Sequence, residues 1–362
     1  PGALPGTPFH LLPQTPGREA LRADALPRGL WLLLLAGAAL VAFGADLFLG
    51  SVSIPPERVL RALLSWGVQD PQDRIVLAFR LPRAATALLA GAALAASGLL
   101  MQTLFENPLA GSFVLGVDSG AGLGVALLLL AADSLGAGIS RFLALGGVAA
   151  ASWAGSLAVL LVVLLVSRRV ENNTVLLILG LMFGYASGSL VTVLLHFSSG
   201  EQAHGYLAWS FGTFSGTTGA QVGVMALGIL PALLAACALA KPLNALLLGE
   251  RYAATMGVPV RRLRGGLIVV AALLSGSVTA FCGPVAFLGI ATPHLCRALL
   301  RTEDHRVLLP ACVAAGSLLA LGADLVSRGL GGGLPLPVNA VTSLLGAPVV
   351  VWVVLRGRGG RR

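Results

Sequence analysis

Long apolar runs separated by short polar connections occupy most of this chain. The stretches 142–166 and 172–200 contain no Asp, Glu, Lys or Arg, and each exceeds the ~20 residues that a helix needs to cross a bilayer. Backbone groups inside a membrane must be hydrogen-bonded within the protein, so continuous apolar runs of this length are expected to be helices. A membrane β-barrel would instead show segments of about ten residues with alternating apolar and polar positions. The pattern therefore predicts an all-α, polytopic membrane protein.

The apolar runs predict about ten transmembrane helices. The predicted spans are 30–50, 84–104, 112–132, 142–166, 174–197, 221–240, 265–282, 284–300, 307–326 and 337–355. Residues 51–81 and 241–264 are too long for simple turns, and the amphipathic segment 56–66 is expected to lie as a helix on the outer surface of the membrane. Residues 201–220, rich in Gly and aromatic residues, are expected to form a short outside or re-entrant helix.

Composition and charge support a membrane protein rather than a nucleic-acid-binding one. The chain is 56% hydrophobic and 11% charged, whereas a typical soluble domain carries about 25% charged residues. Ten spans place both termini on one side, and most of the 24 basic residues fall in the connections on that side. An excess of Lys and Arg marks cytosolic connections, so the net charge of +9 reports orientation and both termini are expected in the cytosol.

The expected organisation is a single membrane domain between two tails. Residues 1–28 are rich in Pro and are expected to be a cytosolic N-terminal tail followed by a retained first helix rather than a cleaved signal peptide. Residues 29–356 form the ten-helix domain, with a cytosolic segment at 241–264, and residues 357–362 form a basic C-terminal tail. The four cysteines lie in apolar segments without metal-ligand spacing, so they are interpreted as packing residues and no metal site is predicted.

Small residues recur at helical spacing in two spans. Gly116, Gly120 and Gly124 form one stripe, and Gly180, Gly184 and Gly188 form another. Such stripes allow helix backbones to approach closely inside a membrane. The same positions could instead line a transport pathway, and the sequence leaves both interpretations open.

Few ionisable residues fall within the predicted spans, and such residues are candidates for function in a membrane. They are Asp46, Asp118, His196, His294 and Asp324. Asp46, Asp324 and His196 lie near span ends where water is expected to reach them, and Asp324 is four residues before Arg328, which favours a local ion pair. Asp118 is expected either to cap a helix start or to act as a polar pathway residue. The sequence therefore offers no clear proton or sodium relay of the kind that a secondary transporter needs.

The chain also lacks a nucleotide-binding loop of its own. Its single lysine, Lys241, lies in ALAKPLN rather than in GxxxxGK[ST]. If ATP drives transport, a separate chain must hydrolyse it, and residues 241–264 are the natural docking segment for that chain. The same segment could instead be an amphipathic helix that lies on the membrane surface.

Five blocks resemble the FecCD family, the permeases of iron-siderophore, haem and cobalamin ABC importers. They are RLPRAATALLAGAALAASGLLMQTLFENPLAGSFVLGVDSGAGLGVAL (80–127), KPLNALLLGERYAATMGVP (241–259), GPVAFLGIATPHLCR (283–297), TEDHRVLLPACVAAGSLLALGADLVSR (302–328) and LPVNAVTSLLGAPVVVWVVL (336–355). The first block, with its FENPLA loop, is similar above all to the cobalamin-carrying members. Asp118 occupies a position that is usually neutral in the family.

The resemblance implies a homodimeric, multi-pass permease of the inner membrane that is not itself an enzyme. It implies two cytosolic ABC ATPase subunits, which would carry ATP and Mg, and a periplasmic or lipid-anchored substrate-binding protein. No cofactor is expected on this chain. A ferric siderophore or haem is the expected cargo, with cobalamin as the alternative within the family and an ion-coupled secondary transporter as the alternative from another class. His204, beside Tyr206 and Trp209, is interpreted as a surface histidine rather than a haem contact.

The resemblance also implies three groups of site residues. The residues expected to dock the binding protein are Arg80, Arg83 and Arg328, although Arg80 and Arg83 could simply anchor a helix at the headgroups. The residues expected to couple to the ATPase are Leu246, Gly249, Glu250, Ala253, Met256, Gly257 and Val258. The residues expected to line the translocation path are Ser187, Val191, Leu194, Gly205, Phe211, Phe214, Ser343 and Leu344.

Overall fold

The structure, a computed structural model, describes residues 27–50, 52–65, 70–130, 147–167, 169–170, 173–329 and 336–359, and every regular element in these ranges is a helix. Seven helical stretches are long and apolar enough to cross a membrane. They are α2 (Arg28–Phe48), Pro71–Leu104, α9 (Gly147–Ser167), α10 (Asn173–Phe197), α12 (Gly219–Ala238), α15 (Val260–Cys282) and α17 (His305–Gly329). Three further helices, α6 (Val117–Leu130), α16 (Leu288–Leu300) and α18 (Val338–Gly359), complete the set. Each of the ten predicted spans therefore corresponds to a helix.

Shorter helical segments also occur. They are α3 (Pro56–Ser65), α4 (Pro71–Arg74), η1 (Ile75–Arg80), η2 (Ser112–Leu115), α11 (Gly200–Ser210), α13 (Ala240–Leu246) and α14 (Glu250–Thr255). Of these, α4 and η1 form the first part of the Pro71–Leu104 stretch, and the others lie between the spans. Helix α3 confirms that 56–65 is helical, and α11 confirms a short helix within 201–220. A capping box begins α11, in which Ser199 and Gln202 each bond the backbone N–H of the other and so satisfy two groups at the helix start.

Helix α5 (Leu81–Leu104) forms the centre of the larger helix group. Twenty of its 24 residues are buried, and α2, α12, α15, α16 and α17 pack around it. Small residues make this possible, because a Cβ added to Gly91 would overlap the backbone of Gly316 on α17. A Cβ added to Gly98 would overlap the backbone of Gly289 on α16. Close backbone approach of this kind is how helices associate where lipid removes the hydrophobic drive for packing.

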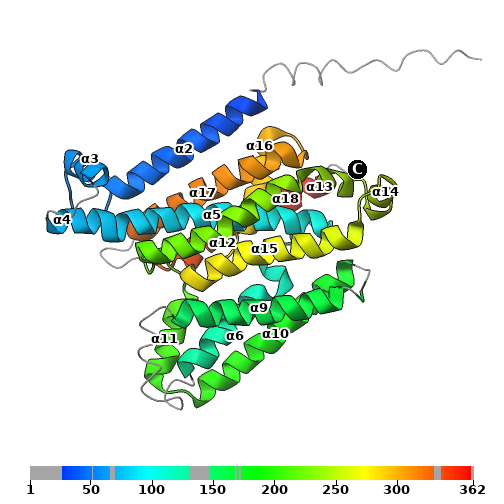
Figure 1. Ribbon diagram of the computed structural model, residues 1–362, viewed down its shortest axis with the longest axis horizontal. Coiled ribbons are helices and arrows are strands. Elements are labelled where there is room, and N and C mark those ends of the chain that lie inside the picture. Colours follow the sequence, from blue (N-terminus) through cyan, green and yellow to red (C-terminus); the bar gives the residue numbers. More distant parts are fainter. Residues whose placement is uncertain are drawn as a thin grey trace, which may run out of the picture.

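A second group contains α6, α9, α10 and α11, and it lies against the first group through α15 (Figure 1). Gly124 of α6 packs on Ala151 and Gly155 of α9 so closely that neither glycine could carry a side chain. Gly180 of α10 is equally close to the backbone of Val114. The packing interpretation of the glycine stripes is therefore confirmed at these positions. It does not hold for Gly188, around which a Cβ would meet nothing within 4 Å.

The connecting elements gather at two opposite ends of the bundle. Helices α3, α4 and α11 lie at one end, called here the α3 end, and α13 and α14 lie at the other, called the α14 end (Figure 1). These two sets are the connections that the sequence assigned to opposite sides of the membrane. Only Pro27 and Arg28 of the predicted N-terminal tail lie within the described residues, and α18 extends to Gly359 into the predicted C-terminal tail.

Three predicted boundaries were wrong, two of them for a local backbone reason. Helix α6 begins at Val117 rather than at 112, because Gly116 adopts a left-handed φ of 72° that ends the short 3₁₀ turn before it. Helix α16 begins at Leu288 rather than 284, because Gly283 and Phe287 have φ of 72° and 67°. Residues 71–80, predicted to belong to a connection, continue α5 as a helix through a π-helical segment.

The close approach at Gly98 gives a stability prediction. Gly98→Ala should destabilise the protein by about 1–3 kcal/mol or more, because the added methyl group meets the rigid backbone of α16 rather than a flexible side chain. Gly37→Ala is the matched control, since a Cβ at that α2 position meets nothing within 4 Å. Thermal unfolding in detergent measures both. An unfolding temperature for Gly98→Ala equal to that of Gly37→Ala would contradict the packing described here.

Candidate functional site

Five charged residues converge at the α3 end, called here the arginine–aspartate cluster. The cluster consists of Arg80, Arg83, Arg328, Asp46 and Asp324, and it joins α2, α5 and α17. All three arginines predicted to dock a partner therefore meet in one place. Each of them also binds groups within the chain.

Arg83 and Asp324 form the centre of the cluster. Arg83 donates from Nε to Asp324 Oδ2 at 2.9 Å and from Nη2 to Oδ1 at 2.9 Å, which is a bidentate pair between α5 and α17. Arg328 Nε lies 3.3 Å from the same carboxylate, one helical turn along α17. Bidentate pairs fix geometry as well as charge, so α5 and α17 are held in one register here.

The other contacts attach α2 to the same point. Arg328 forms an ion pair with Asp46 and donates to the carbonyl of Leu49 at 2.9 Å. Arg80, which is buried, donates to the carbonyls of Leu47 and Phe48 at 2.8 and 3.0 Å. These carbonyls belong to the last turn of α2 and have no partner within that helix, so Arg80 satisfies them and caps the helix end.

The sequence-based interpretation of the two aspartates was wrong in one respect. Asp46 and Asp324 were expected at water-accessible span ends, yet they are 1% and 0% exposed. The local pair between Asp324 and Arg328 is present, but the better geometry belongs to Arg83, which lies 241 residues away in sequence. Asp118 accepts a hydrogen bond from Thr279 Oγ1 of α15 at 2.9 Å, and His196 and His204 are exposed.

The predicted coupling segment lies at the α14 end as two short helices. Gly249 and Gly257, at φ of 96° and 83°, allow the chain to turn at either side of α14. Leu246 and Ala253 are buried against the bundle, so these two residues hold the segment in place rather than face outward. Val258 is partly buried.

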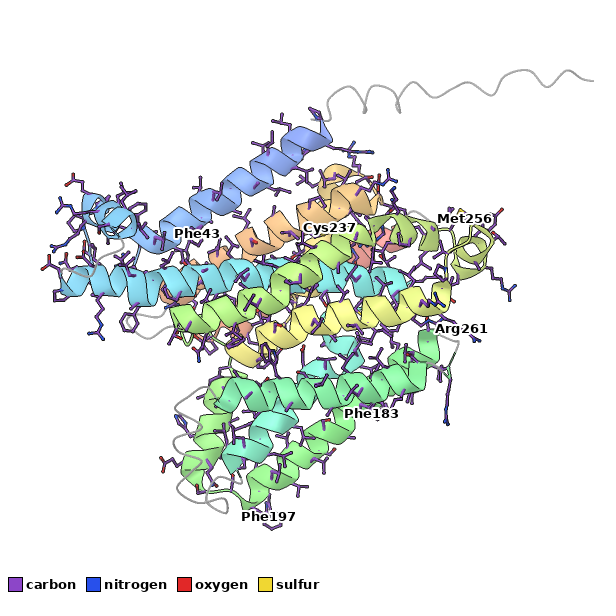
Figure 2. All side chains as sticks on the ribbon, viewed as in Figure 1. Phe43, Phe183, Phe197, Cys237, Met256 and Arg261 are labelled. Atoms are coloured by element: carbon purple, nitrogen blue, oxygen red, sulfur yellow. The ribbon has the colours of Figure 1, made fainter. Side chains whose placement is uncertain are left out.

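Four large side chains on this segment are exposed and form its outer surface, called here the coupling tip. They are Leu247, Leu248, Tyr252 and Met256. Met256 lies beside α14 at the α14 end (Figure 2). Sequence reasoning identified Met256 but missed the other three. Leu248, Tyr252 and Met256 are spaced four residues apart, a signal that could have found Leu248 and Tyr252, whereas Leu247 falls outside this spacing.

Glu250 connects the coupling segment to three membrane helices. Arg264 at the start of α15 donates to both of its carboxylate oxygens, at 2.9 and 3.1 Å. Asn173 at the start of α10 donates to Glu250 Oε1 at 2.9 Å and to the carbonyl of Leu104, the last residue of α5, at 2.9 Å. A movement of α14 would therefore act on α15, α10 and α5 together.

A second polar network holds α13 at the same end. The Nδ1 atom of His305 lies 2.8 Å from Asn244 Oδ1, and its Nε2 atom lies 2.7 Å from Thr103 Oγ1 of α5. Asn244 also donates to Asp304. The backbone N–H of Arg306 and the amide of Asn244 hold the pKa of the Asp304 carboxyl below its usual value. Sequence reasoning missed this network because its members are polar residues scattered over three blocks.

The predicted path residues do not all face one surface of the subunit. Ser187, Val191 and Phe214 are buried, whereas Phe211 and Leu344 are exposed. Leu194, Gly205 and Ser343 are partly exposed. The segment after α11 does meet α18, because the backbone N–H groups of Val338 and Asn339 donate to the carbonyls of Gly212 and Phe211 at 3.3 and 3.2 Å.

Comparison with known proteins adds a family to this geometry. The model of the FecCD transport family matches residues 37–356, which is nearly the whole membrane domain. The chain belongs to the FecCD transport family. FecCD proteins are permease subunits of ABC importers, so this chain is a multi-pass transport subunit rather than the catalytic one.

Named FecCD relatives resemble the chain over nearly its full length. It is 38% identical to the vitamin B12 import system permease of Klebsiella pneumoniae, over 91% of this chain and 94% of that protein. It is also 38% identical to the same permease of Escherichia coli O9:H4, over 91% of this chain and 95% of that protein. A solved inward-facing transporter, assigned to the metal-chelate ABC type, is 27% identical with a TM-score of 0.78, covering 90% of this chain and 98% of that one.

Proposed function

We propose that this chain is the membrane-spanning subunit of an ABC importer that carries vitamin B12 into the cytosol. The observation that carries this proposal is the 38% identity over 91% of the chain to vitamin B12 import permeases. It favours cobalamin over the ferric siderophore or haem that the family resemblance alone led us to expect first. The metal-chelate neighbour at 27% identity fits either cargo, so an iron chelate is the second candidate.

The ATPase subunits bind at the coupling tip in this proposal. The coupling tip is an exposed apolar surface in the connection between the membrane helices α12 and α15, formed by Leu247, Leu248, Tyr252 and Met256. An exposed apolar patch outside the membrane usually marks a surface that a partner covers. Glu250 then transmits movement, because its contacts with Arg264 and Asn173 join the tip to the bundle. ATP and Mg belong to the partner chain. The α14 end faces the cytosol, in agreement with the excess of basic residues assigned to that side.

The substrate-binding protein docks at the opposite, α3 end. Arg83 and Arg328 are each 16% exposed at their side chains, so part of each side chain faces outward while the guanidinium groups bind Asp324 and Asp46. Charges at such a rim steer and orient a partner more than they add affinity. Arg80 acts indirectly in this proposal, by holding the end of α2 beside the other two arginines.

A second copy of the chain completes the path. Both α10 and α18 present exposed apolar residues, among them Met182, Tyr185, Leu344 and Leu345. In a homodimer these faces meet around a central passage, and Phe211 lies beside α18 at the outer end of that passage. An apolar passage suits a cargo whose selection occurs largely on the binding protein.

Cellular uptake tests the cargo. The chain is expressed together with its ATPase and binding protein in a bacterial host that lacks its own vitamin B12 permease. The uptake of labelled cyanocobalamin is then compared with the uptake of a labelled ferric siderophore and of labelled haem. The proposal predicts cyanocobalamin uptake that disappears when the permease is omitted. Siderophore or haem uptake without cyanocobalamin uptake would move the assignment to the second candidate. Uptake of none of the three would remove the support for both.

A further inference from the structure

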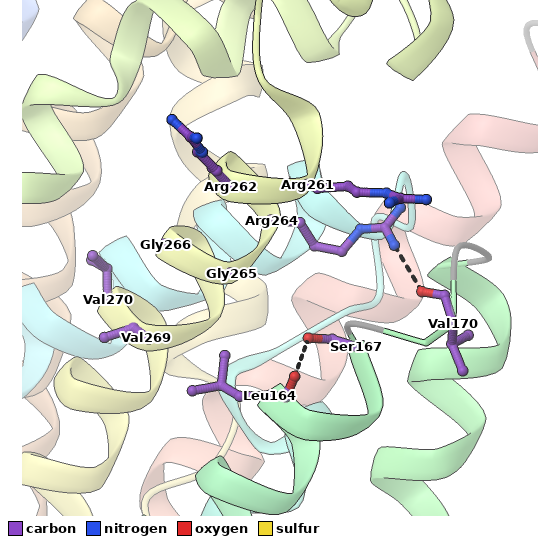
Figure 3. Close-up of a pocket in the computed structure, with 10 residues that line it drawn as sticks. All are labelled: Leu164, Ser167, Val170, Arg261, Arg262, Arg264, Gly265, Gly266, Val269 and Val270. Atoms are coloured by element: carbon purple, nitrogen blue, oxygen red, sulfur yellow. Dashed lines mark hydrogen bonds between the residues drawn. The ribbon is translucent and has the colours of Figure 1, made fainter.

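A basic pocket opens between α9 and α15 at the α14 end, away from the coupling tip and the path residues. Its volume is about 710 Å³, and its mouth is lined by Arg261, Arg262 and Arg264 of α15. The deeper wall is apolar and includes Leu164 of α9 and Val269 and Val270 of α15. Figure 3 shows Arg261 and Arg264 extending toward Val170, Arg262 extending the opposite way, and Leu164, Val269 and Val270 below them.

The pocket lies where the chain passes from polar to apolar residues. Helix α15 begins VRRLR and continues as GGLIVVAALL, so its arginines fall at the membrane surface and its valines within the hydrocarbon. Arg264 is fixed there by Glu250 and by the carbonyl of Val170 at 3.0 Å. Among the described residues, those that line the pocket include no carboxylate, and Arg264 is paired with Glu250 beside it. The mouth is therefore a basic site at headgroup depth in which Arg264 is held in place.

Two glycines keep the pocket open. A Cβ added to Gly265 or Gly266 would meet nothing within 4 Å, in contrast to Gly91 and Gly98, where helix packing excludes a side chain. Glycine weakens a helix interior relative to alanine, so packing alone gives no reason for two glycines here. Both residues line the basic pocket, and larger side chains there would fill it.

A second, apolar cavity follows along the same two helices toward the membrane centre. It has a volume of about 280 Å³ and is lined by Leu157 and Leu160 of α9 and by Ala272, Leu273 and Gly276 of α15, among others. On both helices it lies about one turn from the residues of the basic pocket. A basic mouth above an apolar groove matches a molecule with an anionic head and a long aliphatic tail.

We propose that this site binds an anionic phospholipid, with the phosphate at Arg261 and Arg262 and one acyl chain in the groove between α9 and α15. Basic pockets between membrane helices on the cytosolic side bind acidic headgroups. A free phosphate would leave the apolar groove unused, and a zwitterionic headgroup would gain less from Arg261 and Arg262. This site is separate from the docking and path residues and adjoins the coupling segment through the pair of Arg264 with Glu250. The proposal depends only on the chain being embedded in a membrane.

Native mass spectrometry of the full chain in mild detergent tests the proposal. The probes are palmitoyl-oleoyl phosphatidylglycerol, phosphatidylcholine with the same chains, and glycerol phosphate as the soluble anion. We expect retained phosphatidylglycerol, little phosphatidylcholine and no competition from glycerol phosphate. Arg261→Gln with Arg262→Gln should lower the affinity for phosphatidylglycerol roughly tenfold or more, since each basic residue near an acidic headgroup contributes to binding. Arg28→Gln with Arg306→Gln is the control, because both arginines are exposed elsewhere.

A second variant separates loss of binding from loss of folding. Gly266→Leu keeps every charge, places its side chain in open space and should also displace phosphatidylglycerol while the protein elutes as the wild type does in size exclusion. Equal retention of phosphatidylcholine would overturn the proposal. So would unchanged phosphatidylglycerol binding in Gly266→Leu. Displacement by glycerol phosphate would replace the lipid site with a site for small anions.

Discussion

Replacing Asp324 by alanine should destabilise the folded protein by about 3–5 kcal/mol, the largest stability effect expected of any single change described here. Asp324 is fully buried and binds Arg83 and Arg328 at once. Without Asp324, the largely buried guanidinium groups of Arg83 and Arg328 lie near each other, and within this cluster only Asp46 remains to balance their positive charge. The protein should be recovered in low yield, and its unfolding temperature in detergent should fall steeply.

Two further variants make this test specific. Glu57→Ala removes an exposed carboxylate at the same end of the bundle and should leave stability within about 0.5 kcal/mol of the wild type. Arg83→Leu combined with Asp324→Leu removes the central pair together and should recover part of the loss, because apolar residues of similar volume can replace a buried ion pair. An Asp324→Ala protein as stable as Glu57→Ala would contradict the cluster as described.

Placing a charge at the coupling tip should abolish binding of the ATPase while the permease stays folded. Leu248→Asp with Met256→Asp introduces two carboxylates into an apolar surface that is exposed in the single subunit. Apolar anchors at the centre of an interface each contribute about 2 kcal/mol or more, so the loss of two should weaken binding roughly a thousandfold. Surface changes of this kind have little effect on stability. Affinity purification of the tagged ATPase measures the bound permease.

The matched control lies at the opposite end of the molecule. Leu64→Asp changes an exposed leucine on α3, which is 83% exposed and remote from α14. It should leave ATPase binding unchanged. Equal binding by the coupling-tip variant and Leu64→Asp would show that the partner contacts another surface. A coupling-tip variant that fails size exclusion would point to a packing role for Leu248 and Met256 that their exposure contradicts.

The hydrophobic pattern predicted the spans well because a long, continuous apolar run is stable in a membrane only as a helix. It could not predict the late starts of α6 and α16. Those depend on left-handed backbone at Gly116, Gly283 and Phe287, which has no signature in an apolar pattern. It also missed the helical residues 71–80, where the polar run PQDR precedes an apolar run, IVLAF, that is too short to predict a span.

The same limit applies to the site residues. The family resemblance identified the three docking arginines in the sequence, but their burial with Asp46 and Asp324 depends on contacts between distant segments. Within the coupling segment, sequence similarity marked Leu246 and Ala253 alongside Met256. Only the packing of α13 and α14 separates the buried pair from the exposed tip. Docking and coupling at these residues remain predictions.

Transport by the reconstituted complex tests the central claim most directly. The permease, its ATPase and its binding protein are placed together in liposomes, and labelled cyanocobalamin uptake is followed with ATP and with imposed proton or sodium gradients. The account predicts accumulation that requires ATP and the ATPase and that persists when ionophores remove every gradient. Uptake by the permease without the ATPase, driven by an ion gradient, would contradict it and would make Asp118 the first residue to examine for ion coupling.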